Sequence, residues 1–469
     1  MNWHGKKWLV LGMGETGLSM VRWLTRQGAE VCVADNRVAP PNLPILEQMI
    51  PAEKIYCGPF NAAAFDDADA IAISPGVPLA EPLVQDAIRR GVPVVGDVEL
   101  FAWALDQAEQ PRPKILAITG SNGKTTVTTM VGEMVKNAGC DVEVAGNIGP
   151  AVLEALMRRM DWGKLPQYWV LELSSFQLET TRHLAADAAA VLNLSEDHFD
   201  RYTSMHDYAA AKARLFISDR ESVQILNRDD AAIRAMALPG RKQLTFGLGE
   251  PLSDRDFGLQ RNGIDIWLAQ GKINLLKTSE ILVPGMHNIA NALAAMALCR
   301  AVALPYEPLL QALREFKGLP HRMQKIAVIN DVTFYDDSKS TNVGSAIAAL
   351  NGMQKNVVLI AGGDGKGQDF SPLKPAVASC ARAVVLLGRD AHKIAEAIQD
   401  SQVPLHYVAT MEEAVRLSFL LAHPGDAVML SPACASLDMF KNYIHRAEVF
   451  THAVKEIEQK FVHSDRESH

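Results

Sequence analysis

The stretch ILAITGSNGKTTVTTM, residues 115–130, decides the fold class of the central part of the chain. A short apolar run leads into a glycine-rich turn, and Lys124 and two threonines then begin a helical pattern. This order is typical of a loop that binds phosphate through backbone N–H groups. The spacing departs from the G-x-x-x-x-G-K-S/T pattern, because Ile118 stands where the first glycine is expected and Gly120 is the nearest upstream glycine. We therefore predict a phosphate loop that is tighter than the common one.

Similar strand-like runs alternate with helical patterns along the whole chain. WLVLG lies near the N-terminus, WVLELSS in the middle and NVVLIAGG towards the C-terminus. Continuous apolar runs, rather than alternating ones, indicate strands buried on both faces, as in parallel sheets covered by helices. We predict an α/β fold with sites at the carboxyl ends of the strands. Because 469 residues exceed what one core holds, about three domains are expected.

Composition excludes several classes of protein. The net charge of −8 predicts no broad attraction to nucleic acid or to an anionic membrane. None of the six cysteines forms a C-x-x-C pair, so no zinc or redox motif is present, and scattered thiols favour a reducing compartment. Glycines and Glu15 interrupt the apolar run near the N-terminus too early for a signal peptide. We expect a soluble cytoplasmic protein without a membrane span.

A second glycine loop, GMGETG at residues 12–17, follows the first strand-like run. It matches the G-x-G-x-x-G dinucleotide fingerprint, and Asp35 ends the next strand-like run, about twenty residues further on. Three interpretations remain open from the residues alone. The loop binds a nicotinamide or flavin dinucleotide, it is a turn that needs glycine for packing, or it holds another phosphate-bearing ligand at the helix N-terminus.

Three further residues accompany the Lys124 loop as candidates for magnesium chemistry. Glu172 ends a strand-like run, His198 follows another, and Lys212 lies in a helical segment. Lys124 could reach terminal phosphates and Thr125 could hold Mg²⁺. Each candidate also has an ordinary alternative, which is a solvated glutamate, a surface histidine or a solubilising lysine.

Taken together, the motifs resemble those of the Mur ligases. The central ones are TGSNGKTT, GNIG, ELSSFQLE, NLSEDHFDRY and YAAAKARLF, and the later ones are GMHNIANALAA, LPHRM, DDSKSTN, AGGDGKGQDF and LSPACASLDMFKNY. They cover nearly the whole chain in the family's order. DDSKSTN (336–342) and SPACASLDMF (431–440) are specific to the member that adds D-glutamate to UDP-N-acetylmuramoyl-L-alanine. Sister ligases carry a D-Y-A-H type motif at the first of these positions.

The resemblance implies three domains. They are a Rossmann-like domain for the UDP-substrate at 1–97, a central P-loop ATPase-like domain with a mostly parallel sheet at 98–318, and a Rossmann-like domain for the amino acid at 319–469. Composition alone would place the first boundary near 110, at the Pro-rich segment EQPRPK. The implied reaction is ADP-forming amide bond formation through an acyl phosphate, in cytoplasmic synthesis of peptidoglycan precursors. A monomer is expected, and the short glycine loop is the family's own pattern.

The resemblance also assigns the nucleotide and metal residues. Those implied at ATP are Gly120, Ser121, Asn122, Gly123, Lys124, Thr125, Thr126, Asn291, Arg322 and Asp337. Two Mg²⁺ ions are implied, with Thr125, Glu172, His198 and Lys212 as ligands and Lys212 carried as a carbamate. The implied catalytic residues are Lys124, Glu172, His198, Lys212 and Asn147.

The two substrates have implied residues as well. For the UDP-substrate these are Gly14, Glu15, Thr16, Gly17, Asp35, Asn36, Arg37, Ser74, Pro75, Gly76, Asn147 and Gln177, with any contact of Glu15 made through its backbone. For D-glutamate they are Lys339, Thr341, Lys366, Ser436, Leu437 and Tyr443.

Three other functions are weighed against this one. A nicotinamide dehydrogenase would leave the Lys124 loop unused, and a P-loop switch or motor would leave DDSKSTN unused. A sister ligase for another amino acid is disfavoured by Lys339.

Overall fold

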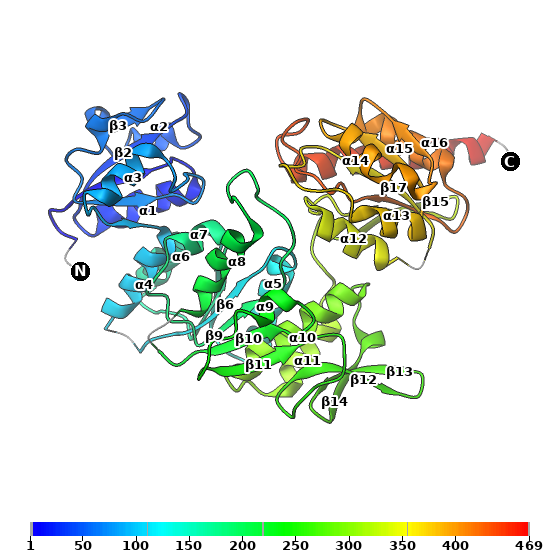
Figure 1. The fold of residues 1–469 in the computed structure, drawn as a ribbon, viewed down its shortest axis with the longest axis horizontal. Coiled ribbons are helices and arrows are strands. Elements are labelled where there is room, and N and C mark those ends of the chain that lie inside the picture. The colour runs from blue at the N-terminus through cyan, green and yellow to red at the C-terminus, as the bar shows by residue number, and fades with distance from the viewer. Residues whose placement is uncertain (1–2, 110, 218–219, 354, 468–469) are drawn as a thin grey trace.

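The computed structural model describes residues 3–109, 111–217, 220–353 and 355–467. Three β-sheets follow one another along the chain, and helices cover each of them (Figure 1). The sheets lie within residues 7–95, 114–277 and 324–430. The predicted boundaries at 97/98 and 318/319 fall between these sheets. Within the described residues, the structure has no helix with the length and apolar character to cross a membrane.

The first sheet is parallel throughout, in the order β3-β2-β1-β4-β5. Its strands are β1 (Lys7–Leu11), β2 (Glu30–Asp35), β3 (Ile55–Cys57), β4 (Ala70–Ile73) and β5 (Val94–Val95). Its helices are α1 (Glu15–Arg26), α2 (Leu43–Leu46) and α3 (Pro82–Arg89). Leu11 pairs with both Ala34 and Ile73, so the loops after β1, β2 and β4 meet at one edge. The first glycine loop is one of these loops.

The central sheet has the order β14-β13-β12-β11-β10-β9-β6-β8-β7. Its parallel strands are β6 (Lys114–Thr119), β7 (Val142–Gly146), β8 (Tyr168–Glu172), β9 (Ala188–Val191), β10 (Val223–Asn227) and β11 (Lys242–Phe246). The strands β12 (Phe257–Asn262), β13 (Asp265–Gln270) and β14 (Ile273–Lys277) extend it at one edge. β12 pairs in parallel with β11, and the β12–β13 and β13–β14 pairs are antiparallel. Its helices are α4 (Asp97–Gln107), α5 (Lys124–Asn137), α6 (Val152–Asp161), α7 (Ser175–Glu179), α8 (Met205–Ala213), α9 (Ala231–Arg234), α10 (Met286–Ala301) and α11 (Tyr306–Glu315).

The third sheet has the order β15-β16-β20-β17-β18-β19 and is parallel except for the β15–β16 pair. Its strands are β15 (Gln324–Ile329), β16 (Val332–Asp336), β17 (Val357–Gly362), β18 (Ala381–Leu387), β19 (Leu405–Tyr407) and β20 (Ala427–Leu430). Its helices are α12 (Val343–Asn351), α13 (Leu373–Cys380), α14 (Ala391–Ile398), α15 (Met411–Leu421) and α16 (Tyr443–Glu467).

Burial explains why the central strands read as continuous apolar runs. Every residue of β8 and of β17 is buried, as is every residue of β6 after its first. α5, α10 and α11 pack together on one face of the central sheet, and α4 and α6 pack against each other. The predicted α/β class with mostly parallel sheets is confirmed.

Candidate active site

The glycine loop of residues 120–123 connects the buried strand β6 to helix α5. Gly123 caps the helix with φ +81°, and a β carbon there would lie 2.5 Å from Asn291 Oδ1. A side chain at this position would be strained by the backbone conformation and would displace the Asn291 side chain. Asn291, on α10, therefore lies directly against the loop.

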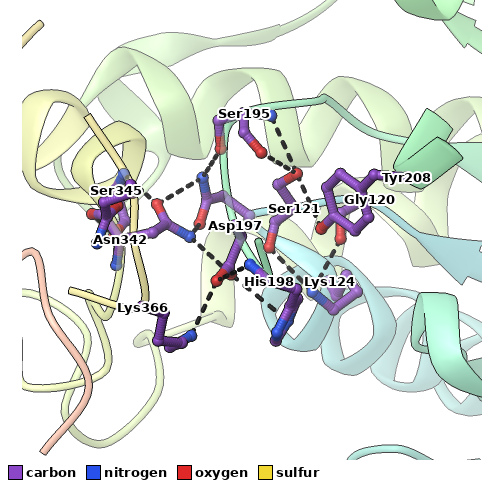
Figure 2. Close-up of polar contacts among 12 residues, drawn as sticks. Gly120, Ser121, Lys124, Ser195, Asp197, His198, Tyr208, Asn342, Ser345 and Lys366 are labelled. Carbon is purple, nitrogen blue, oxygen red and sulfur yellow. Dashed lines mark hydrogen bonds and ion pairs between the residues drawn. The ribbon is translucent and has the colours of Figure 1, made fainter. Parts of the chain in front are cut away.

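Two lysines converge on one carbonyl of this loop. Lys124 Nζ donates to the Gly120 carbonyl at 2.8 Å and to the Ser121 carbonyl at 2.9 Å. Lys212 Nζ, from α8, donates to the same Gly120 carbonyl at 2.9 Å and lies over the Tyr208 ring (Figure 2 shows the loop and Lys124). Burial, and then the neighbouring Lys124 charge, lower the pKa of Lys212 well below its usual value. Burial also lowers the pKa of Lys124, against the opposing effect of Glu172.

Glu172 lies beside the loop because β8 pairs with β6, which places Glu172 opposite Ile118. The carboxylate is buried, and its Oε1 accepts a bond of 2.7 Å from Asn147 Nδ2. Its Oε2 has no hydrogen-bond partner among the described residues. A buried carboxylate oxygen without a partner is costly unless something binds it. A hard cation such as Mg²⁺, which prefers oxygen ligands, fits that oxygen.

His198 lies near the same loop with its backbone in the left-handed region, at φ +59°. Its ring packs edge-on against Phe176, with centroids 4.8 Å apart, and its Nε2 is 3.6 Å from Asp197 Oδ2. Burial lowers the pKa of His198 to about 4, although Asp197 opposes the shift. The imidazole is therefore neutral near pH 7, which is the form that can ligate a metal.

The metal assignment rests on a mixed set of groups, a threonine hydroxyl, a carboxylate, an imidazole and a modified lysine. Within the described residues, no three His, Cys, Asp or Glu side chains are grouped so as to hold an ion by themselves. The unpartnered Glu172 oxygen and the neutral His198 ring are the observations that fit an ion at this position.

A cavity of about 900 Å³ opens next to the loop, between the central sheet and the third one. Of the predicted residues, Asn122, Gly123, Thr126, Asn291, Arg322, Asp337 and Lys339 line it. Asn193, Asn227, His287 and Asn288 line it too, and sequence reasoning did not select them. Their motifs were visible, NLSEDHFDRY for Asn193 and GMHNIANALAA for His287 and Asn288, but no pattern singled out these positions.

Asp337 and Arg322 face this cavity from the third part of the chain. The Asp337 carboxylate accepts bonds from Met323 N at 3.1 Å, from Ser431 Oγ at 2.8 Å and from Ser340 Oγ. Burial raises the pKa of Asp337 to about 6 despite these bonds. Burial lowers the pKa of Arg322, and Asp337 and Glu172 oppose that shift.

A second cavity, of about 710 Å³, lies at the loop edge of the first sheet and reaches the central part of the chain. All the predicted UDP-substrate residues except Gly17 line it, together with Gly12, Val77, Gly146, Ile148, Gly149 and Ala151. Gly17 has another task, because a β carbon there would lie 1.8 Å from the Gly12 carbonyl oxygen. It allows α1 to pack closely on the glycine loop.

The acidic residues of this second cavity are already engaged. Asp35 Oδ2 accepts from Met13 N at 2.7 Å, and both of its oxygens accept from the Arg37 side chain. Burial would raise the pKa of Asp35, but these bonds hold it below its usual value. Glu15 Oε1 accepts from Asn42 Nδ2 at 3.2 Å.

The residues predicted for the amino acid are only partly brought together. Lys339 Nζ lies 3.9 Å from the centroid of the Tyr443 ring, and burial followed by the Arg322 charge lowers the pKa of Lys339 to about 8. Lys366 instead pairs with Asp197 at 2.8 Å (Figure 2). Ser436 is buried, whereas Leu437 is 72% exposed. Within the described residues, the side chains of Thr341 and Leu437 form no hydrogen bond or ion pair with the other four.

Comparison with known proteins identifies the family. Three family models match, the Mur ligase MurD-like N-terminal domain at residues 6–96, the Mur ligase middle domain at 118–299 and the Mur ligase glutamate ligase domain at 321–434. The chain belongs to the Mur ligase family. It has the three-domain architecture of the Mur ligases, and the match to their middle domain includes the phosphate loop of residues 120–123.

Close relatives carry one name. The chain is 69% identical over 464 residues to the UDP-N-acetylmuramoylalanine--D-glutamate ligase of Nitrosomonas europaea, covering 98% of each chain. It is 58% identical to the ligase of that name from Methylobacillus flagellatus, covering 97% and 98%, and 51% identical to the one from Chromobacterium violaceum, also covering 97% and 98%.

Solved structures support the fold at lower identity. A pseudomurein peptide ligase type C from Methanothermus fervidus aligns with a TM-score of 0.59 and 18% identity, over 97% of this chain and 100% of that one. The UDP-N-acetylmuramate-alanine ligase of Thermotoga maritima gives the same values.

Proposed function

We propose that this protein is an ADP-forming ligase that joins D-glutamate to UDP-N-acetylmuramoyl-L-alanine in the cytoplasmic synthesis of peptidoglycan precursors. The observation that carries the proposal is the Asn147–Glu172 bond of 2.7 Å. Asn147 lines the second cavity, and Glu172 lies beside the phosphate loop of the first. A carboxylate at the inner end of one ligand can therefore meet the terminal phosphate of another. The names of the close relatives support the same substrates.

The reaction needs phosphate because a free carboxylate resists attack by an amine. Its charge is delocalised and it has no good leaving group. A carboxylate oxygen attacks the γ-phosphorus of ATP, ADP leaves, and an acyl phosphate forms. The amine of D-glutamate then attacks the acyl carbon, the tetrahedral intermediate expels phosphate, and the amine loses a proton. Enclosing the acyl phosphate between the two cavities would keep water from hydrolysing it.

The chain's own residues hold the nucleotide in this scheme. The backbone of residues 120–123 cradles the phosphates, and Lys124 turns from its loop carbonyls to the terminal phosphate oxygens. Asn291 contacts adenine, while Arg322 and Asp337 contact ribose and phosphates. Thr125, Glu172, His198 and Lys212 would hold Mg²⁺. When bound, that metal neutralises the charge that gathers where an anionic carboxylate meets a triphosphate.

Lys212 would act as a carbamate. Its lowered pKa increases the share of neutral amine, which is the form that attacks CO₂, and the product is an anionic oxygen group of the kind Mg²⁺ accepts. The modification would also replace the second lysine Nζ that now donates, alongside Lys124, to the Gly120 carbonyl.

The substrates occupy the two outer domains, which we place at 1–97 and 319–469 around a central domain at 98–318. The diphosphate binds the N–H groups of Gly14–Gly17, and Asp35, Asn36, Arg37 and the 74–76 loop line the uracil side. D-Glutamate is a dianion with an amine, and Lys339, Thr341, Lys366, Ser436, Leu437 and Tyr443 would surround it. The enzyme would work as a monomer.

The test is phosphate release from ATP, Mg²⁺ and UDP-N-acetylmuramoyl-L-alanine, with single amino acids added in turn. We expect release that depends on D-glutamate. Release indifferent to every amino acid would refute the proposal, and dependence on another amino acid would reassign the substrate.

Lys212→Ala tests the carbamate separately. The variant should lose activity, and a short-chain carboxylate such as acetate should restore part of it by supplying the missing oxygens. Lys136→Ala, which removes a lysine from the last turn of α5, is the matched control and should stay active. Loss at Lys212 without any rescue would remove the carbamate and leave the ligase reaction standing.

A further inference from the structure

The segment Asn193–Tyr202, here called the bridging segment, contacts loops of both outer domains. It follows β9 and ends shortly before α8. Two charged side chains carry these contacts, Asp197 towards the third domain and Arg201 towards the first. Both are largely buried, with 11% and 12% of the side chain exposed. Neither was selected from the sequence, because nothing in a single sequence says which distant loop each would meet.

Asp197 holds two groups of the third domain (Figure 2). Its Oδ1 accepts from Lys366 Nζ at 2.8 Å, and its Oδ2 accepts from Asn342 Nδ2 at 3.3 Å. Asn342 also exchanges side-chain bonds of 3.0 and 3.3 Å with Asn122 of the phosphate loop. Asp197 therefore lies at the centre of a chain of contacts from Lys366 to the loop that holds phosphate. Burial would raise the pKa of Asp197, but the Lys366 ammonium 2.8 Å away holds it below its usual value.

Arg201 holds the first domain in a similar way. It donates from Nη1 to the Pro75 carbonyl at 2.6 Å and from Nη2 to the Val77 carbonyl at 3.4 Å. Glu179 Oε2 lies 2.6 Å from Nη2 and orients the guanidinium. The guanidinium also stacks on the Phe176 ring, at 4.2 Å from the centroid, and Phe176 packs against His198. Residues 74–77, the loop to which Arg201 donates these hydrogen bonds, line the second cavity.

We propose that Asp197 and Arg201 are positioning residues, each for a different substrate. Asp197 orients Lys366 for a carboxylate of the incoming amino acid, and Arg201 orients the 74–77 loop for the UDP-substrate. The inference rests on the proposed function for the identity of the two substrates. It adds that one segment of the central domain sets both outer sites relative to the phosphate loop.

The chemistry of the donors explains why these contacts can coexist with a ligand. An ammonium has three N–H donors, so Lys366 can keep its bond to Asp197 and still offer two donors to an arriving carboxylate. Arg201 binds carbonyl oxygens of the loop and uses none of its N–H groups. Ser74 N donates to the Leu11 carbonyl and Val77 N to the Ser74 carbonyl, so within residues 74–77 the Gly76 N–H is the group left for the substrate. Holding these groups in place before binding removes part of the cost of ordering them.

The test is a crossed measurement of KM for all three substrates. Asp197→Asn should raise KM for D-glutamate at least about tenfold and change KM for the UDP-substrate less than about threefold. Arg201→Gln should do the reverse. Each variant is thus the control for the other, since both remove a buried charge from the same segment.

A double substitution tests whether Asp197 acts through Lys366. If Asp197 acts through Lys366, adding Asp197→Asn to Lys366→Met should raise KM for D-glutamate no further. Equal rises in all three KM values for both variants, effects confined to kcat, or full additivity with Lys366→Met would overturn the proposal. A fall in KM for D-glutamate in Asp197→Asn would do so too, because it would mean that Asp197 competes with the substrate.

Asn342→Ser covers the case in which Asp197→Asn does not fold. Serine still caps α12, as Asn342 does, but it is too short to reach Asn122 or Asp197. It should raise KM for D-glutamate and leave KM for the UDP-substrate unchanged, and the opposite pattern would contradict the proposal. Product formation by the unmodified enzyme is measured separately. If that enzyme forms no product, the ligase reaction has failed; if it does, the KM values of the variants test the positioning roles.

Discussion

The two glycine loops of this protein share the order of strand, glycine loop and helix, and they differ in their side chains. Each follows a parallel strand and ends in a glycine that caps a helix, Gly14 before α1 and Gly123 before α5. The first helical residue is Glu15 in one loop and Lys124 in the other. Among the described residues that line the second cavity, Arg37 is the one cation, and it is paired with Asp35. At the other loop, two lysines, Lys124 and Lys212, both donate to the Gly120 carbonyl.

The difference indicates what each loop does with phosphate. Backbone N–H groups at a helix N-terminus are enough to hold a diphosphate that stays intact. Transfer of a phosphoryl group needs charge that is stabilised as it moves, and hence lysines and metal. A glycine fingerprint therefore reports a phosphate site, while the side chains that reach it decide between holding and transferring.

The largest expected effect on activity comes from replacing the first helical residue after each loop, which is where the two loops differ in charge. Lys124→Met should lower kcat/KM for the complete reaction about 10²–10³-fold, because it removes the cation that reaches the terminal phosphate. Glu15→Gln, the matched change in the other loop, should alter it less than about fivefold, because Glu15 is exposed and faces Asn42. Steady-state product formation measures both. Equal losses in the two variants would mean that both loops serve transfer.

The second prediction concerns the unpartnered oxygen beside the Lys124 loop. Glu172→Gln should raise the Mg²⁺ concentration needed for half-maximal rate about 10–100-fold, and EDTA should abolish the activity of the unmodified enzyme. Glu143→Gln is the control, since Glu143 is a buried carboxylate of the same domain whose two oxygens are taken by Arg158 and Arg159. An unchanged Mg²⁺ requirement in Glu172→Gln would remove Glu172 from the metal site.

The third prediction separates packing from binding within the first loop. Gly17→Ala should destabilise the protein by about 3 kcal/mol, because its β carbon would overlap the Gly12 carbonyl oxygen. Gly14→Ala should change stability by less than about 1 kcal/mol, since no atom lies within 4 Å of a β carbon there. Urea unfolding followed by circular dichroism measures both. Similar stability of the two variants would show that the loop can move away from α1.

The last prediction concerns buried carboxyls beside the two cavities. Burial raises the pKa of Asp97, which bonds Gln177 at the second cavity, and that of Asp337 at the first, each to about 6. A raised pKa means that the folded chain binds the proton more tightly than the unfolded chain does. Each group should therefore lower the free energy of unfolding by about 3 kcal/mol as pH rises from about 4 to 6, and the loss should persist above pH 6.

Asp97→Asn checks this sign directly, because an amide does not titrate and its oxygen can still accept from Gln177. The variant should be more stable than the unmodified protein at pH 8 and about equal to it near pH 4. Denaturant unfolding at the two pH values gives the comparison. A variant that is less stable at pH 8 would show that the charged carboxylate is stabilising.

Sequence reasoning reached the local features of the fold because they depend on local pattern. Continuous apolar runs gave the buried parallel strands, and the order of strand, glycine and helix gave both loops. The antiparallel strands β12–β14 were not predicted, since they lie at an edge where several residues are exposed and no continuous apolar run marks them.

The site residues also include some that the sequence predicted and some that it did not. All but Gly17 of the residues assigned to the UDP-substrate line one cavity, although their roles came from a resemblance and remain predictions. Asp197, Arg201 and Asn342 lay in recognised motifs but were not selected. Their importance depends on partners between 22 and 220 positions away, which a single sequence does not pair.

The most direct test of phosphoryl transfer to a carboxylate follows an oxygen atom. UDP-N-acetylmuramoyl-L-alanine labelled with ¹⁸O in its terminal carboxylate should give inorganic phosphate that carries one ¹⁸O per amide bond formed, because the oxygen that attacks the γ-phosphorus leaves with it. Mass spectrometry of the phosphate from a reaction with ATP, Mg²⁺ and D-glutamate provides the measurement. Amide product accompanied by unlabelled phosphate would contradict an acyl phosphate, and phosphate without amide product would contradict the ligase itself.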